Sequence, residues 1–191
     1  MIEIRWHGRG GQGAKTAALM LADVAFSEGF YVQAFPEYGP ERMGAPITAF
    51  TRINEKEIRV HTNIYAPDMV VIVDETLIGA VDMTKGLKED GKIVVNTKRP
   101  PADVAEAFKD YKGEVYAVDA ADISIRYLGK NLPNMPLLSV VTKLVGVITE
   151  DAFLNEMTEN LKGKFSKKPE VIEGNLNAIK EAWNSAIRVN E

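Results

Sequence analysis

A glycine-dense segment at residues 6–16 constrains the fold of this chain more than any other feature. The segment is Trp-His-Gly-Arg-Gly-Gly-Gln-Gly-Ala-Lys-Thr, with glycine at four of the six positions from Gly8 to Gly13. Such a backbone turns tightly, adopts positive φ angles and lets another group approach closely, because no Cβ intervenes. An alternating, strand-like segment precedes it, and a segment rich in Ala, Leu and Met follows it. The pattern predicts a strand, a loop and a helix whose N-terminus points into the loop.

The loop is a candidate site for a phosphate or another anion, because the free N–H groups and the dipole of a helix N-terminus attract negative charge. The spacing Gly8-x-Gly10-x-x-Gly13, after a strand and before a helix, is typical of dinucleotide-binding loops. A Walker A loop is excluded because Ala14 separates Gly13 from Lys15. The candidate cofactor-binding residues are Gly8, Arg9, Gly10, Gly11, Gln12 and Gly13. A tight turn needed for packing alone is the alternative, and the spacing leaves both open.

The polar side chains around this loop also allow two interpretations each. His7 either donates to an anion or has a structural role at the end of the strand. Arg9 and Lys15 either add positive charge to the loop or face solvent. Gln12 offers a donor and an acceptor, so it either contacts a partner across an interface or braces the loop.

A second loop, at residues 36–46, is shaped by three prolines and two glycines. It follows residues 30–35, whose aromatic and β-branched content predicts a strand that ends at Pro36. Both loops leave the carboxyl ends of strands, so we expect them at the same sheet edge, where open α/β sheets bind ligands. The candidate residues for an interface or active-site loop are Glu37, Tyr38, Gly39, Glu41 and Arg42.

Glu37 and Arg42 each allow a second interpretation. Glu37 stands where a ribose-binding carboxylate is expected in a nicotinamide site, but Pro36 ends the strand before it. The first strand also alternates, whereas a central Rossmann strand is usually apolar throughout. Arg42 with Glu41 or Glu37 is alternatively an ordinary surface ion pair, which contributes little stability.

The remaining pattern predicts one α/β domain over residues 1–191, a three-layer α/β/α fold. We expect a mixed, mostly parallel sheet with a Rossmann-like start and C-terminal helices. Residues 2–35 predict a right-handed, parallel βαβ unit, and 47–53 with 57–61 predict a β-hairpin. The other expected strands are 68–74, 93–96 and 115–119, and the expected helices are 14–28, 102–111, 121–128, 137–148, 151–161 and 169–187. A strand is the alternative at 137–148, because that stretch is rich in β-branched residues.

Composition excludes several classes of function. The chain has no cysteine, so it forms no disulfide, is no thiol catalyst and binds no iron–sulfur cluster through thiolates. Two histidines make a His-rich metal site unexpected, and a net charge of −4 argues against nucleic-acid binding. No segment has the length of a membrane span, and the start of the chain is unlike a signal peptide, so we expect a cytoplasmic protein. No set of side chains demands catalysis by this chain alone.

Three segments together resemble the gamma subunit of pyruvate:ferredoxin oxidoreductase and related 2-oxoacid:ferredoxin oxidoreductases. They are residues 6–13, 35–46 and 67–75, and the likeness extends over most of the chain. Relatives that act on 2-oxoglutarate-type substrates tend to have a Gly-Gly pair where this chain has Gly44-Ala45. The Ala45-Pro46 version is more similar to the pyruvate or branched-chain type.

The resemblance implies oxidative decarboxylation of pyruvate with coenzyme A to acetyl-CoA, CO₂ and reduced ferredoxin, within a heterotetramer of alpha, beta, gamma and delta subunits. It also implies thiamine diphosphate with Mg between the alpha and beta subunits, and [4Fe-4S] clusters in the beta and delta subunits. We expect the glycine loop to help bind coenzyme A, the second loop to close the active site beside a partner subunit, and the isolated chain to be inactive. The alternatives are a 2-ketoisovalerate-type substrate, a stand-alone dinucleotide-binding Rossmann-like protein, and a purely structural assembly subunit.

Overall fold

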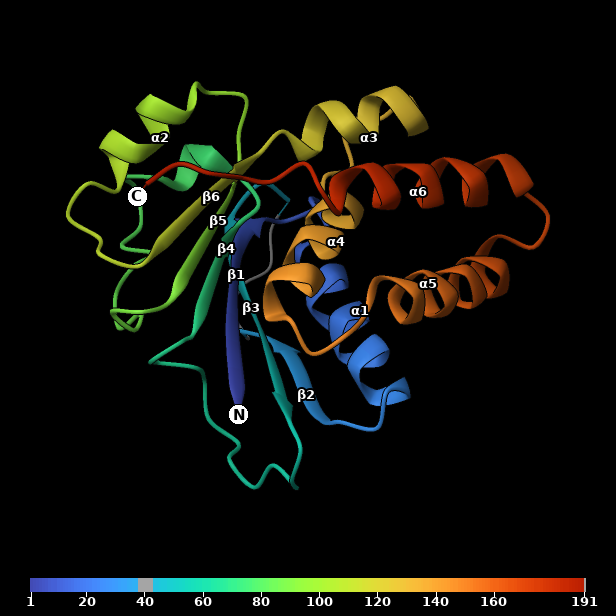
Figure 1. The fold of residues 1–191 in the computed structure, drawn as a ribbon, viewed down its shortest axis with the longest axis horizontal. Helices are drawn as coiled ribbons and strands as arrows, with labels where there is room; N and C mark the ends of the chain where they lie inside the picture. Colours follow the sequence, from blue (N-terminus) through green and yellow to red (C-terminus); the bar gives the residue numbers. More distant parts are fainter. Residues whose placement is uncertain (38–42, 191) are drawn as a thin grey trace.

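A seven-stranded sheet forms the centre of the molecule in the computed structural model, which describes residues 1–37 and 43–190 (Figure 1). Its strands are β1 Ile2–Arg9, β2 Tyr31–Pro36, β3 Pro46–Asn54, β4 Met69–Ile72, β5 Lys92–Asn96, β6 Glu114–Val118 and β7 Ile187–Arg188. They lie in the order β2-β3-β1-β4-β5-β6-β7. The strands β2, β1, β4, β5 and β6 run in one direction, and β3 and β7 run against them. The expected mixed, mostly parallel sheet is confirmed.

The position of β3 shows that the expected hairpin is wrong. β3 pairs antiparallel with β1, with Ile2 opposite Ile53, and antiparallel with β2, with Tyr31 opposite Asn54. Both of its edges are therefore occupied, and residues 57–61 form an irregular segment instead of a partner strand. β1 and β2 do run parallel, as expected for a βαβ unit, but β3 lies between them.

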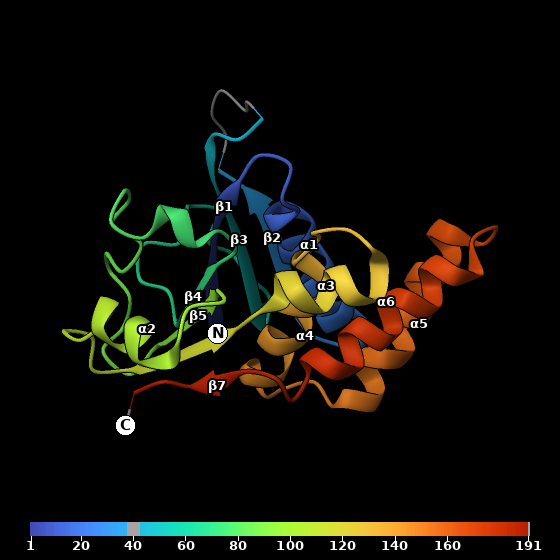
Figure 2. The ribbon, with the colours of Figure 1, turned by 90° about the horizontal axis from the view of Figure 1, so that it is seen from above.

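The helices divide unequally between the two faces of the sheet. They are α1 Ala14–Ser27, α2 Pro101–Ala107, α3 Ala120–Leu128, α4 Asn134–Val145, α5 Glu150–Phe165 and α6 Pro169–Ala182, with a short 3₁₀ helix η1 Glu75–Leu77. Figure 2 shows α1, α3, α4, α5 and α6 on one side of the sheet and α2 on the other. The expected C-terminal helices are confirmed, and the last one ends earlier, because Ile187 joins the sheet beside β6. No described helix is long and apolar enough to cross a bilayer.

Each face of the sheet has its own hydrophobic core. On the helical face, Ile4 and Trp6 of β1 are fully buried against α1 and the C-terminal helices. On the other face, Val70 and Ile72 of β4 pack with Leu77 and residues of α2. β4 is buried on both sides, as its continuous apolar run predicts.

A buried arginine ties the three strands at one side of the sheet together. Arg52 on β3 is 1% exposed, and its Nε donates to Glu3 Oε1 on β1 at 2.8 Å. Its Nη1 donates to Gln33 Oε1 on β2 at 3.1 Å. A buried ion pair that loses one partner leaves an uncompensated charge, so this contact fixes the register of β1, β2 and β3.

Candidate functional site

The glycine loop (residues 8–13) and the described part of the second loop are joined by backbone hydrogen bonds. Gly10 N donates to Ala45 O at 2.9 Å, and Gly44 N donates to Gly10 O at 3.1 Å. Both loops therefore lie at the carboxyl end of the sheet, as expected. Of the second-loop candidates, Glu37 is described, while Tyr38, Gly39, Glu41 and Arg42 lie outside the described residues.

Close packing accounts for several of the glycines. A Cβ on Gly8 would lie 3.1 Å from Ala14 Cβ. Gly11 and Gly13 have φ angles of 94° and 81°, which other residues rarely adopt. A Cβ on Gly13 would also lie 2.8 Å from Asn134 Cγ at the start of α4. Close packing and positive φ angles therefore account for glycine at these positions, and no side chain among the described residues caps the N-terminus of α1.

Gln12 and Arg9 brace the loop within this chain. Gln12 Oε1 accepts from Arg9 N at 2.8 Å, and Gln12 Nε2 donates to Asp74 Oδ2 at 2.5 Å. Arg9 Nη2 donates to Thr76 Oγ1 at 2.9 Å, and Nη1 donates to Gly44 O at 3.1 Å. Of the two interpretations of Gln12, these contacts support local bracing, and Arg9 does not simply face solvent. Sequence reasoning missed the role of Asp74, which it used only as the end of an apolar run.

The N-terminus of α1 opens into a groove between the two loops, here called the α1 groove, with a volume of about 410 Å³. Among residues 1–37 and 43–190 no side chain caps α1, and its first turn carries no acidic residue. The first-turn N–H groups of a helix have no intrahelical acceptor, so they are available to a ligand. The residues lining the groove are Gly10, Gly11, Gly13, Ala14, Lys15, Thr16, Met43 and Ile47. Lys15 is the only charged member of this set, so the electrostatics favour an anion.

A second hollow lies where the strand order reverses. The crossover from β1 leads to β2 at one edge, while β5 and β6 follow β4 toward the other, so the switch point lies between β1 and β4. A cavity of about 510 Å³ opens there, the switch-point cavity. It is lined by the carboxyl side chains Asp74, Glu75, Asp119 and Asp122, with Lys98 as the basic residue. This excess of negative charge disfavours a phosphate.

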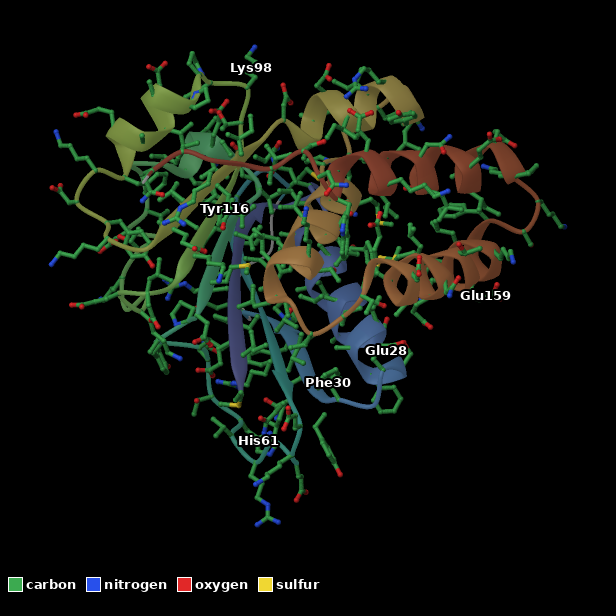
Figure 3. All side chains as sticks on the ribbon, in the orientation of Figure 1. Glu28, Phe30, His61, Lys98, Tyr116 and Glu159 are labelled. Carbon is green, nitrogen blue, oxygen red and sulfur yellow. The ribbon has the colours of Figure 1, made fainter. Side chains whose placement is uncertain are left out.

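Figure 3 shows Lys98 at one end of the molecule and His61 at the opposite end. Lys98 lies two residues after the end of β5, so it marks the end where the parallel strands terminate. His61 belongs to the irregular segment after β3 and is exposed. The chain's two histidines are therefore in contrasting settings, because His7 is buried within β1.

Glu37 is not placed as a ribose-binding carboxylate would be. It follows β2, which is separated from β1 by β3, so about 10 Å of sheet lies between the two strands. Its backbone N–H donates to Thr48 O at 2.8 Å, and its Oε1 accepts from Asn63 Nδ2 at 3.4 Å. In a dinucleotide site the carboxylate follows the strand next to the glycine loop. The geometry does not favour the stand-alone dinucleotide-binding alternative.

Of the two interpretations of His7, the structure supports a structural role and not that of a hydrogen-bond donor to an anion. It is 7% exposed, and its Nε2 accepts from Arg5 Nε at 3.1 Å. Burial, and then the neighbouring positive charge of Arg5, lower the pKa of His7 to about 4. Arg5 in turn donates from Nη2 to Met83 O at 2.7 Å and to Lys85 O at 2.8 Å. The polar face of β1 is thus covered by the segment after β4.

The fold and these loops define a mixed α/β chain with a glycine loop at a helix N-terminus. Residues 3–185 match the family model for pyruvate ferredoxin/flavodoxin oxidoreductase. The chain is 46% identical over 187 residues, 98% of each chain, to the pyruvate/ketoisovalerate oxidoreductases common subunit gamma of Thermococcus kodakarensis. The chain therefore belongs to the pyruvate ferredoxin/flavodoxin oxidoreductase family, and the resemblance to its gamma subunits is confirmed.

Solved structures agree with this assignment. The crystal structure of pyruvate oxidoreductase subunit PORC from Thermotoga maritima has a TM-score of 0.82 and 37% identity, covering 98% of this chain and 97% of that one. A 2-oxoglutarate:ferredoxin oxidoreductase from Magnetococcus marinus, solved with 2-oxoglutarate, coenzyme A and succinyl-CoA bound, has a TM-score of 0.69 and 18% identity. That match covers 95% of this chain and 30% of the longer chain, and it shows a shared fold only.

Proposed function

We propose that this chain is the gamma subunit of a 2-oxoacid:ferredoxin oxidoreductase that converts pyruvate and coenzyme A to acetyl-CoA, CO₂ and reduced ferredoxin. Its partners are the alpha, beta and delta subunits, which hold thiamine diphosphate, Mg and the [4Fe-4S] clusters. The relatives named for pyruvate synthase support pyruvate as the substrate. The relatives named for pyruvate and ketoisovalerate support a branched-chain 2-oxoacid as the second candidate. The absence of cysteine supports partner-held clusters.

Within this complex, the α1 groove binds part of coenzyme A, and the second loop closes the active site. The observation that carries this proposal is the N-terminus of α1, which has no side-chain cap among the described residues and opens into a groove whose described lining includes Lys15 and no carboxylate. A pyrophosphate fits N–H donors at a helix N-terminus, with the positive end of the helix dipole behind them. Met43, 89% exposed, and Ile47 add apolar surface for the uncharged arm of the molecule. The switch-point cavity suits coenzyme A less, because four carboxyl side chains line it.

The chain contributes binding and positioning rather than a reacting group. The described lining of the α1 groove contains no nucleophile or general base, apart from a lysine and a threonine hydroxyl on the surface of α1. His7 is buried beside Arg5, so it is not presented to the groove. The chemistry of decarboxylation and electron transfer then belongs to the partner subunits. The isolated chain is expected to show no pyruvate-dependent reduction of ferredoxin.

The deciding experiment measures coenzyme A binding by calorimetry, and its KM, in the assembled complex. Lys15→Glu replaces an attractive charge at the groove by a repulsive one, and we expect roughly tenfold weaker binding, as for two exposed charge interactions. Gly11→Asp adds a carboxylate at the groove, where even its Cβ would lie 2.9 Å from Met43 Sδ. We expect it to weaken coenzyme A binding further, with the KM for pyruvate unchanged.

The matched control is Lys167→Glu, which makes the same charge change at an exposed position after α5. It is expected to leave coenzyme A binding unchanged. Normal coenzyme A affinity in both groove variants refutes the binding role and leaves the purely structural assembly subunit. Binding of a reduced nicotinamide cofactor by the lone chain would favour the dinucleotide-binding alternative instead.

A further inference from the structure

We propose that Asp74 is a positioning residue for the α1 groove, holding the glycine loop and the second loop in place from outside the groove. The inference rests on the proposed function, because it concerns the same coenzyme A site. Asp74 directly follows Val73 after β4 and does not line the α1 groove. Its two carboxylate oxygens act on the groove through two separate sets of contacts.

The first set runs through Gln12 to the backbone of the glycine loop beside Gly10, which lines the groove. Gln12 Nε2 donates to Asp74 Oδ2 at 2.5 Å, while Gln12 Oε1 accepts from Arg9 N at 2.8 Å. The amide therefore connects the backbone of the glycine loop to the end of β4. The link depends on an acceptor at position 74, because the donor end of Gln12 faces it.

The second set runs through Thr76 and Arg9 to Gly44, next to Met43, which lines the groove. Thr76 Oγ1 donates to Asp74 Oδ1 at 2.7 Å and accepts from Arg9 Nη2 at 2.9 Å. Arg9 Nη1 then donates to Gly44 O at 3.1 Å in the second loop. Three loops that are far apart in sequence are thus connected through one carboxylate.

The charge of Asp74 matches this arrangement. Partial burial raises the pKa of Asp74, but hydrogen bonds from Thr76 and Gln12 and the positive charge of Arg9 outweigh it, so the pKa lies below its usual value. Arg9 Nε also lies 3.3 Å from Asp74 Oδ2. Hydrogen bonds to an ionised acceptor are stronger than neutral ones, so the ionised form holds the loops best.

The test exchanges the two partners of the amide–carboxylate pair in the assembled complex. Asp74→Asn leaves one acceptor oxygen where the parent carboxylate has two, so either Gln12 or Thr76 loses its acceptor, and Gln12→Glu places two carboxylates against each other. Losing a hydrogen bond to a charged group corresponds to roughly a tenfold effect or more, so we expect each single variant to raise the KM for coenzyme A about tenfold. The KM for pyruvate is expected to stay at the parent value.

The double variant is the decisive arm. With Gln12→Glu and Asp74→Asn combined, the amide introduced at position 74 donates to the carboxylate introduced at position 12, and a hydrogen bond is restored. We expect the KM for coenzyme A to return to within about threefold of the parent value. A double variant as impaired as the two single changes multiplied together overturns the proposal, because the two residues then do not act as a pair.

A measurement without coenzyme A separates this inference from the proposed function. Amide exchange of Gly10 and Gly44 in the full chain reports the hydrogen bonds that join the two loops. We expect amide exchange to be faster in each single variant than in the parent chain, and to return toward the parent rate in the double variant. Thr76→Val is expected to speed exchange at Gly44, and Thr76→Ser, which keeps the hydroxyl, is not.

The outcomes then differ for the two ideas. Unchanged exchange in Asp74→Asn and Gln12→Glu, with Lys15→Glu still weakening coenzyme A binding, overturns only the positioning role. Faster exchange with normal coenzyme A kinetics in every variant, Lys15→Glu included, overturns the proposed function and the inference that rests on it.

Discussion

The stability of this chain should fall steeply in mild acid because His7 is buried next to Arg5. The pKa of His7 in the folded chain is lowered from 6.5 to about 4, mainly by burial and then by the charge of Arg5. The unfolded chain therefore binds the proton more tightly than the folded chain does. By linkage, the stabilisation by neutral His7 is fully present above pH 6.5 and is lost as the pH falls toward 4.

The magnitude follows from the size of this shift. Each pKa unit corresponds to about 1.4 kcal/mol, so the free energy of unfolding loses about 3 kcal/mol in the acid limit from this residue. At pH 5 the same relation gives about 2 kcal/mol. For a chain of this length, that corresponds to a melting temperature roughly 4–8 °C lower than at neutral pH.

Urea unfolding of the full chain between pH 7.5 and pH 5 measures the effect. The variant His7→Gln removes the titrating group and keeps a side-chain oxygen that accepts from Arg5 Nε, so its stability should depend on pH less steeply, by about 2 kcal/mol over this range. Only slopes are compared, so a general destabilisation of the variant does not matter. The control His61→Gln removes the other histidine, which is exposed, and should keep the parent slope. A His7→Gln slope equal to that of the parent refutes the reasoning.

Two further predictions concern stability. Gly13→Ala adds a Cβ 2.8 Å from Asn134 Cγ at a φ of 81°, while the Cβ added by Gly44→Ala meets no described residue within 4 Å at a φ of 78°. We expect a loss of about 1 kcal/mol for Gly44→Ala and clearly more for Gly13→Ala, and equal losses in thermal unfolding would contradict the close contact. Arg52→Met leaves the half-buried carboxylate of Glu3 on β1 unpaired and should cost about 3 kcal/mol, the lower end expected for a broken buried pair, whereas Arg59→Met, at an exposed ion pair, should cost less than about 1 kcal/mol. Similar urea midpoints for these two variants would show that the buried pair does not fix the strands.

Local features of the fold were predictable from the sequence, because they depend on residues close together in the chain. The glycine loop between a strand and α1 follows from the glycine spacing and from the change of hydrophobic period on either side of it. The buried strand β4 follows from an apolar run bounded by acids, and α4 follows from the length of its apolar stretch. These elements lie close to their predicted residues.

Partner choice within the sheet was not predictable in the same way. The alternating residues of β3 predict a strand with two unlike faces, but they do not say which strands lie beside it. β3 pairs with β1 and β2, which are distant from it in sequence. The predicted hairpin between residues 47–53 and residues 57–61 is therefore wrong. The alternation of β1 likewise predicted a polar face, but only the fold shows that residues after β4 cover Arg5 and His7.

At the candidate site, too, the sequence predicted the local features but not the contacts between residues distant in the chain. Sequence spacing indicated the glycine loop as a place for an anion, and the uncapped N-terminus of α1 fits that expectation. The uses of Arg9 and Gln12 depend on Asp74 and Thr76, which come from another part of the chain. A charged residue within a glycine loop therefore does not by itself indicate a phosphate ligand, because this arginine is engaged with the neighbouring loops.

This engagement of Arg9 limits what the chain can bind alone. With Arg9 held by Thr76 and Gly44, the positive charges that the described lining of the α1 groove offers to an anion are Lys15 and the helix N-terminus, which is equivalent to about half a unit charge. Coenzyme A carries a pyrophosphate and a further ribose phosphate, so its negative charge exceeds what this described lining compensates. Under the proposed function, a partner subunit supplies further cations. We therefore expect the isolated chain to bind coenzyme A far more weakly than the complex does, and to lose that binding as salt is raised. Equal affinity of the isolated chain and the complex, measured by calorimetry at the same ionic strength, would contradict a site shared between subunits.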